Sequence, residues 1–405
     1  MGGESKVTWN PYSKGYFEDP YKHLKECREQ NPIHKGSHGA WMFFRHKESY
    51  EILRSSKYQV SELSQYFLEK EPYIFKESAC PYLSAGTKKW AMYLNGEDHK
   101  NARLVMGKAF KEFDLPVILS ESVEEVNQKF KNEQDFDLVT YCAYFIFQVI
   151  KRFYSLPDNY SFSQIKKYSN MIARSQDLFV PKQVYQEINK WFLSGNEMFN
   201  NINSKQGYKE NLMAISNKLG ISYDNEDILS ILAVSLMAAF ETSKDSLSMA
   251  LLELIDKPLL MEAVLASDEE QLSAIIEELF RFTAPLQYTV RVNKEPVEYE
   301  GHTIEANSKL YLCIASANRD PAVFQNPDQL IFSRPGTNHL AFGSGPHVCA
   351  GANIARQEMK YCLKHMLEFL KDYEINNSEP ITYAKQIMMR TIESARLRKK
   401  QHALS

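Results

Sequence analysis

Residues 227–255 form one long stretch of helical hydrophobic periodicity that contains neither glycine nor proline. The stretch predicts a helix of about eight turns, and Asp227 can cap its start. A helix of this length must bury apolar side chains along much of its surface. The chain is therefore expected to fold around a large, mainly helical core.

Segments 267–282 and 353–373 predict two further helices, and the first begins with a Ser-Asp-Glu-Glu run that resembles a capping box. Glu300-Gly301 and Asn307-Ser308 are expected turns between short strands. Those strands are predicted at 41–44, 297–299, 303–304 and 309–314. Because no repeat or linker interrupts the chain, we expect one large domain, 1–405, that is mainly α with a small β region.

The 405 residues carry 48 Lys+Arg and 51 Asp+Glu, a formal net charge of −3, which argues against a nucleic-acid-binding protein. The N-terminus is polar, so no secretory signal is expected. No run of about 18 apolar residues occurs, so no membrane anchor is expected either. The chain is predicted to be cytoplasmic, and its six cysteines, which include no C-x-x-C pair, predict neither a disulfide framework nor a zinc ribbon.

A glycine-rich turn, residues 343–346, precedes Cys349 at the start of the predicted 353–373 helix. The N–H groups and positive dipole of a helix N-terminus lower the pKa of a thiol and stabilise its thiolate. A single cysteine without a second ligand at metal spacing cannot close a zinc site, but it can ligate haem iron. The alternative is an inert buried cysteine beside a turn.

Five residues of this turn match the haem-ligand loop of the cytochromes P-450, namely Phe342, Gly345, His347, Cys349 and Gly351. The sequence thus resembles that family of haem-thiolate monooxygenases. The resemblance implies a single triangular helical prism that encloses haem b, with Cys349 as the iron ligand and Gly343 also at the cofactor.

Two further sets of residues resemble family positions around the haem. Glu278, Arg281 and Arg334 correspond to a structural triad, E-x-x-R plus a later arginine, that supports the cysteine loop. The resemblance assigns four cations to the haem propionates: His99, Arg103, Arg291 and His347.

Ala238 to Thr242 resembles the family's A-G-x-[D/E]-T stretch on the helix that crosses the distal face of haem, with Ala239 where glycine is commonest. The resemblance places Ala238 at the cofactor. It implies that Thr242 holds oxygen or a water and that Glu241 relays protons. The alternative for Thr242 is a hydroxyl bonded to its own helix.

The substrate pocket implied by the resemblance includes the segment 61–90, with Tyr66, Phe67, Tyr73 and Phe75, and six further residues: Phe240, Leu286, Gln287, Tyr288, Met388 and Met389. These side chains suit a sizeable apolar or aromatic molecule. Each can equally be plain core packing.

No flavin or ferredoxin domain is fused to the chain, so electrons are expected from a separate ferredoxin or flavodoxin with its reductase. A basic face of Lys100, Arg356, Lys360 and Lys364 suits such an acidic partner. The alternative for these cations is an ordinary solvated surface.

The predicted function is a P-450 monooxygenase that uses NAD(P)H electrons and O2 to oxidise a C–H or C=C bond, with secondary-metabolite tailoring as its biology. Two alternatives remain at this point. One is a P-450 that couples aryl groups or performs another oxidation without oxygen insertion. The other is a haem-binding sensor or recruitment protein without turnover.

Overall fold

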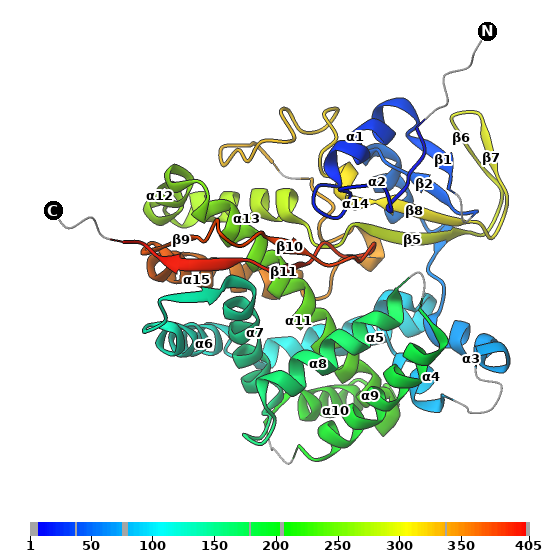
Figure 1. Cartoon of the computed structure of the whole chain (residues 1–405). Coiled ribbons are helices and arrows are strands. Elements are labelled where there is room, and N and C mark those ends of the chain that lie inside the picture. Colours follow the sequence, from blue (N-terminus) through cyan, green and yellow to red (C-terminus); the bar gives the residue numbers. More distant parts are fainter. Residues whose placement is uncertain are drawn as a thin grey trace, which may run out of the picture. The chain divides into compact units, whose positions relative to one another are not determined.

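The computed structural model describes residues 7–36, 39–74, 80–177, 180–202, 206–336 and 338–401, and its contacts divide the chain into two compact units. Unit 1 comprises residues 1–60, 252–352 and 377–395, whereas unit 2 comprises residues 61–251, 353–376 and 396–405. Figure 1 shows helices as the main element of the chain, together with small sheets. The mainly α fold class with a small β region is confirmed.

Unit 1 carries the larger sheet. Its helices are α1 (Tyr21–Gln30), α2 (His46–Arg54), α12 (Pro258–Ala266), α13 (Glu269–Thr283) and α14 (Ile314–Ala317), with a 3₁₀ turn at Gly345–His347. Its strands are β1 (Ile33–Lys35), β2 (Trp41–Phe43), β3 (Tyr58–Gln59), β5 (Tyr288–Asn293), β6 (Val297–Tyr299), β7 (His302–Ile304), β8 (Lys309–Cys313), β10 (Thr382–Tyr383) and β11 (Ile392–Ser394).

The sheet of unit 1 has the strand order β1-β2-β8-β5-β3. Strand β2 runs parallel to β8, and Trp41 lies opposite Leu310. Strand β5 pairs antiparallel with β8, which places Tyr288 opposite Cys313. Apolar residues from β1, β2, β8 and α2 pack into one core, and Leu340 from the cysteine loop joins it.

Unit 2 is built mainly from helices. These are α3 (Leu63–Ile74), α4 (Pro81–Thr87), α5 (Gly96–Ala109), α6 (Leu115–Phe130), α7 (Leu138–Tyr154), α8 (Phe162–Ala173), α9 (Lys182–Asn200), α10 (Tyr208–Lys218), most of α11 (Asn225–Ile255) and nearly all of α15 (Ala352–Leu370). Short 3₁₀ helices lie at Ala91–Tyr93, Phe110–Glu112 and Arg174–Gln176, and a three-stranded sheet β4-β12-β9 is formed by Asp135–Asp137, Arg396–Lys399 and Tyr373–Ile375.

The three helices predicted from sequence are present, with shifted ends. Helix α11 begins at Asn225, two residues before the predicted start, because the Asp224 carboxylate accepts a hydrogen bond from the Asp227 N–H at 2.8 Å. Helix α13 begins at Glu269, and Asp268 forms a capping box with Gln271. Helix α15 spans Ala352–Leu370 and ends three residues before the predicted end.

The predicted strands are also present. Both predicted turns contain a residue with positive φ, +46° at Glu300 and +61° at Asn307. The sequence prediction missed β5, the strand between β8 and β3, because its partners are distant in sequence or too short to show a pattern. Within the described part of the chain, no helix has both the length and the apolar character needed to cross a membrane.

Candidate functional site

Cys349 lies on a tight turn between the 3₁₀ turn and the start of α15. Its N–H donates a hydrogen bond to the Phe342 carbonyl at 2.8 Å, and the Gly343 N–H donates to Leu340 at 2.9 Å. The structure describes all six cysteines, and Cys349 is the exposed one. The loop therefore presents this thiol, while the other five are packed inside the units.

Backbone geometry explains why glycine is needed in this turn. Both Gly343 and Gly345 have φ near +69°, a region that other residues rarely adopt. A Cβ on Gly345 would also lie 2.5 Å from the Leu53 carbonyl oxygen at the end of α2. A side chain at position 345 would therefore fit only if the backbone at Leu53 moved away.

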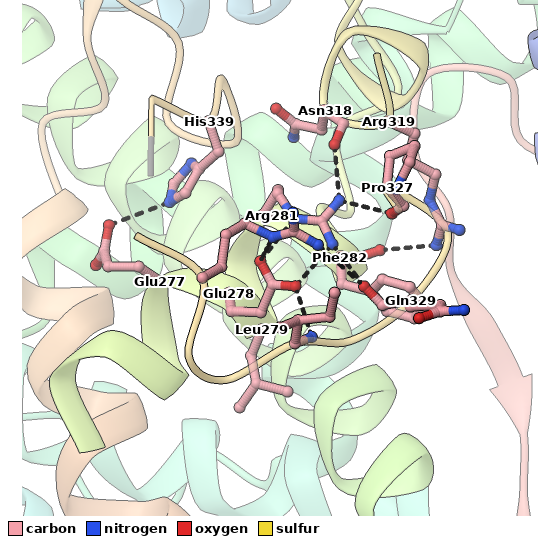
Figure 2. A network of polar contacts seen from close by, with 12 residues as sticks. Glu277, Glu278, Leu279, Arg281, Phe282, Asn318, Arg319, Pro327, Gln329 and His339 are labelled. Carbon is pink, nitrogen blue, oxygen red and sulfur yellow. Dashed lines mark hydrogen bonds and ion pairs between the residues drawn. The ribbon is translucent and has the colours of Figure 1, made fainter. Parts of the chain in front are cut away.

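The three residues of the predicted triad meet in unit 1, as Figure 2 shows for Glu278 and Arg281. Arg281 Nε and Nη2 donate to the two Glu278 oxygens at 2.7 and 2.8 Å, and neither side chain is exposed. Arg334 Nε donates to Glu278 Oε2 at 3.0 Å. Burial would raise the pKa of Glu278, but the hydrogen bonds from Arg281, the Ile331 N–H and Arg334 lower it below its usual value.

A continuous path of contacts links this network to the cysteine loop. Arg281 Nη1 donates to the Asn318 carbonyl at 2.8 Å, and the Asn318 Oδ1 accepts from the Leu340 N–H at 2.7 Å. The rings of Phe280, on α13, and Phe342 contact each other edge to face at 4.7 Å. His339 Nε2 lies 3.1 Å from Glu277 on the same helix (Figure 2). The triad is thus attached to the loop by hydrogen bonds and by ring packing.

Arg291 supplies a test of whether unit 1 fits an acidic group such as a haem propionate. It lies on β5, is 5% exposed, and donates to the Val290 carbonyl at 2.8 Å and to the Thr289 hydroxyl at 3.4 Å. No carboxylate among the described residues pairs with it, and burial lowers the pKa of Arg291 to about 10. A buried guanidinium without a carboxylate fits an external anion.

On α11, in unit 2, the structure gives the predicted catalytic residues definite partners. The Thr242 hydroxyl donates to the Ala238 carbonyl at 2.6 Å, which is the helix back-bond considered as the alternative. The Thr242 oxygen keeps its lone pairs as acceptors. The Glu241 carboxylate also has a partner on the same helix, because its Oε2 accepts a hydrogen bond from Lys244 Nζ at 2.7 Å.

The other predicted cations occupy two helices of unit 2. His99 is buried and Arg103 half-buried on α5, one turn apart. On α15 the predicted basic face consists of three half-buried cations, Arg356, Lys360 and Lys364. Lys100 is exposed on α5 and forms an ion pair with Glu97 at 3.6 Å. In unit 1, His347 closes the 3₁₀ turn of the cysteine loop, and Gly351 follows Cys349 by two residues.

Two segments of the predicted pocket come together in unit 1. Leu286 and Met389 form an isolated β-bridge, and the Gln287 N–H donates to the Met388 carbonyl at 2.8 Å. The Gln287 side chain is buried, and its Nε2 donates to the Ala284 carbonyl at 3.1 Å.

Other predicted pocket residues are packed as core. Tyr288 is buried against Trp9, and its hydroxyl bonds to that of Tyr16 at 2.7 Å. Phe240, on α11, is fully buried within unit 2. Phe75 lies outside the described residues, and only the backbone is described at Tyr73.

Glu358 is a buried acid that the sequence analysis missed. It lies on α15, where its Oε2 accepts from the Ser243 hydroxyl of α11 at 2.7 Å. Burial raises the pKa of Glu358, the hydrogen bond from Ser243 offsets part of this rise, and the resulting pKa is about 7. A signal was present in the sequence, because Glu358 shares a helical face with the apolar residues Cys362 and Met366.

Replacing Glu358 by glutamine should change stability in a pH-dependent way. The folded state keeps this proton up to about pH 7, whereas the unfolded chain releases it near 4.5. The stability that Glu358 contributes is therefore full below pH 4.5 and is lost as pH rises through 7. Relative to the wild type, the variant should gain about 2 kcal/mol in free energy of unfolding between pH 5 and pH 8, measured with urea. Glu368 is exposed on α15, so Glu368→Gln should show no such pH dependence. If both variants showed the same pH dependence, the buried Glu358 carboxyl would not be its cause.

Comparison with known proteins places this geometry in a family. The family model for cytochrome P450 matches residues 69–395. The biotin biosynthesis cytochrome P450 of Bacillus subtilis (strain 168) is 25% identical over 381 residues, which cover 91% of this chain and 93% of that protein. The epothilone C/D epoxidase of Sorangium cellulosum is 25% identical over 402 residues, 95% of this chain and 94% of that protein.

Solved structures show the same fold. P450BioI in complex with acyl carrier protein ligated to hexadec-9Z-enoic acid superimposes with a TM-score of 0.81 at 21% identity, covering 95% of this chain and 99% of that one. The family match implies a haem-iron enzyme, and the solved structures show its fold. The chain belongs to the cytochrome P450 family and is a P450 monooxygenase.

Proposed function

We propose that this protein binds haem b through Cys349 and oxidises a sizeable apolar small molecule of secondary metabolism. The observation that carries the proposal is the single exposed thiol at the start of α15, on a turn tied to the buried Glu278–Arg281 pair. When bound, thiolate-ligated haem activates O2 for transfer of one oxygen atom to substrate. Within unit 1, Arg291 and His347 would be partners of a haem propionate.

The substrate class rests on the residues near the Leu286–Met389 bridge and on the relatives. Leu286, Met388 and Met389 offer apolar and adaptable surface. One relative is an epoxidase of epothilones, and another is solved with a carrier-bound fatty acid. These relatives favour an apolar substrate, free or attached to a carrier. Electrons would come from NAD(P)H through a separate ferredoxin or flavodoxin that docks on the basic face of α15 and α5.

The CO-difference spectrum of the dithionite-reduced protein tests the cofactor and its ligand together. A Soret band at the long wavelength of thiolate-ligated haem is expected. A band at the shorter wavelength would mean that Cys349 does not ligate the iron as a thiolate, and absence of haem would reject the proposal. Substrates can then be found by the spin-state shift that they cause in the resting spectrum.

Replacing Thr242 by alanine should divert consumed O2 into peroxide. Since the Thr242 hydroxyl proton is committed to the Ala238 carbonyl, its oxygen can accept a hydrogen bond from a water that carries a proton. Without that oxygen the proton-carrying water is not held. The share of O2 released as peroxide should rise about tenfold with a surrogate ferredoxin system and a substrate found by spin shift. Thr242→Ser keeps the hydroxyl and should release no more peroxide than the wild type. If Thr242→Ala released the same share of O2 as peroxide as the wild type, Thr242 would not have this role.

A further inference from the structure

The N-terminal segment of unit 1 contacts both chain segments that carry the proposed substrate residues of this unit. The ring centres of Trp9 and Tyr288 are 5.1 Å apart, and the Tyr16 hydroxyl bonds to that of Tyr288. Tyr21, the first residue of α1, contacts Arg390. The N-terminal segment therefore reaches the start of β5 and also the chain just before β11.

We call residues 384–391, which join β10 to β11, the methionine loop, because they include Met388 and Met389. The Arg390 N–H donates a hydrogen bond to the Pro285 carbonyl at 2.7 Å, which holds the loop beside the turn before β5. A methionine side chain is flexible, so the position of its backbone decides which space it can fill. The position of the loop therefore determines the apolar surface that the two methionines offer.

The Arg390 side chain attaches this loop to the N-terminal segment. Its Nη1 donates to the Phe17 carbonyl at 3.1 Å, and its Nη2 donates to the Glu18 carbonyl at 2.8 Å. The Arg390 Cζ lies 4.3 Å from the centre of the Tyr383 ring and 5.5 Å from that of the Tyr21 ring. Two carbonyl groups and two aromatic rings thus fix this guanidinium group.

Tyr21 is itself held by a second arginine. The Arg319 Cζ lies 3.6 Å from the centre of the Tyr21 ring and 4.1 Å from that of Phe282, near the end of α13. Arg319 is 7% exposed, and its Nη2 donates to the Phe282 carbonyl at 3.2 Å (Figure 2). Five residues therefore form what we call the arginine–aromatic series: Phe282, Arg319, Tyr21, Arg390 and Tyr383.

The series connects three parts of unit 1 that are distant in sequence. At one end the buried Arg319 is fixed on α13, and at the other end Arg390 belongs to the methionine loop. Cations are attracted to the faces of aromatic rings, so Tyr21 can contact both guanidinium groups at once. Loss of Tyr21 or of Arg390 would separate the loop from the part of the unit that α13 fixes.

We propose that Tyr21 and Arg390 are positioning residues for substrate selectivity, because they fix the methionine loop and with it the space beside Met388 and Met389. The inference rests on the proposed function, in which these two methionines contact an apolar substrate. Binding of a long apolar molecule depends on the position of the loop. Binding of a small molecule that does not reach the methionines is independent of it.

Hydrogen exchange in the haem-loaded protein tests the attachment of the loop without any turnover. In Arg390→Met the loop loses its contacts with the N-terminal segment, so peptides that span 384–391 should exchange about tenfold faster than in the wild type. Tyr21→Leu should act in the same direction, and Tyr21→Phe, which keeps the ring, should exchange like the wild type. Unchanged exchange in both Arg390→Met and Tyr21→Leu would overturn the proposal.

Tyr50 provides a matched control in the same unit. Its ring centre lies 5.1 Å from the Arg54 Cζ, and the ring packs against the core that contains Leu340. Tyr50→Leu therefore removes a comparable contact between a ring and an arginine, but on α2. Exchange of residues 384–391 should not change in Tyr50→Leu, and an acceleration equal to that of Tyr21→Leu would show that general loss of stability, rather than the series, loosens the loop.

The second test compares optical titrations with imidazole and with 1-dodecylimidazole. Both bind haem iron through an imidazole nitrogen and differ in the alkyl chain. Arg390→Met should weaken binding of 1-dodecylimidazole about tenfold relative to imidazole, because the chain loses its apolar contacts. A loss of stability or of haem would affect both ligands alike, so it would leave the ratio of their dissociation constants unchanged. Tyr21→Phe should keep the wild-type ratio.

The wild-type protein distinguishes the two levels of inference. If it binds 1-dodecylimidazole no more tightly than imidazole, the apolar pocket of the proposed function fails, and the selectivity role fails with it. If the wild type prefers the alkyl chain and Arg390→Met keeps that preference, the pocket stands and the positioning role is wrong.

Discussion

Replacing Arg281 by methionine should lower the free energy of unfolding by about 4 kcal/mol, because it leaves the Glu278 carboxylate buried beside only one remaining cation. The change also removes the donors to Asn318, Pro327 and Gln329. Since Asn318 in turn holds Leu340, the cysteine loop should lose order and the protein should retain less haem. Urea unfolding and the haem-to-protein absorbance ratio measure the two effects.

An exposed ion pair of nearly equal length controls for the loss of an arginine. Arg398 Nε lies 2.8 Å from Glu374 between β12 and β9, with side chains 53% and 44% exposed. Arg398→Met should cost at most about 0.5 kcal/mol, because water replaces the lost contact. If Arg281→Met prevents folding, Arg281→Lys keeps the charge without the planar fork and should fall between wild type and methionine. Equal stability of Arg281→Met and Arg398→Met would show that the buried network contributes little.

Cys349→Ser should abolish the long-wavelength CO-difference band. A serine hydroxyl does not form the soft thiolate bond to iron that produces this band. The measurement is the reduced CO spectrum of protein that still contains haem. Cys80→Ser is the matched control, since Cys80 is buried at the N-cap of α4, where serine is a favourable capping residue. A long-wavelength band that survives in Cys349→Ser would show that another residue ligates the iron.

The local features of the site could be predicted from the sequence. The turn before Cys349 favours glycine, because other residue types rarely adopt positive φ and because a Cβ on Gly345 would lie 2.5 Å from the Leu53 carbonyl oxygen. Glu278 and Arg281 lie three residues apart on one helix, so their pairing is also encoded locally. For the same reason α11, α13 and α15 were predicted with errors only at their ends.

The predicted roles in haem binding, proton delivery and substrate contact remain predictions, and so does the single domain. For Thr242 and Glu241 the structure adds partners that sequence patterns do not reveal, the Ala238 carbonyl and the Lys244 ammonium group. Both contacts are within one turn of α11. The sequence allowed them, but rotamer choice and burial selected them.

By itself the sequence determined the helical class, the glycine turn and the place of a thiol just before a helix start, since each depends on neighbouring residues. Tertiary structure alone decided which charges are buried and which partners they meet. Arg334 reaches Glu278 across 56 positions of sequence, Arg291 is enclosed by strand pairing, and Glu358 meets Ser243 from another helix. The reason is physical: the electrostatic free energy of a charge depends on its desolvation and on partners distant in sequence, and only the folded chain supplies both.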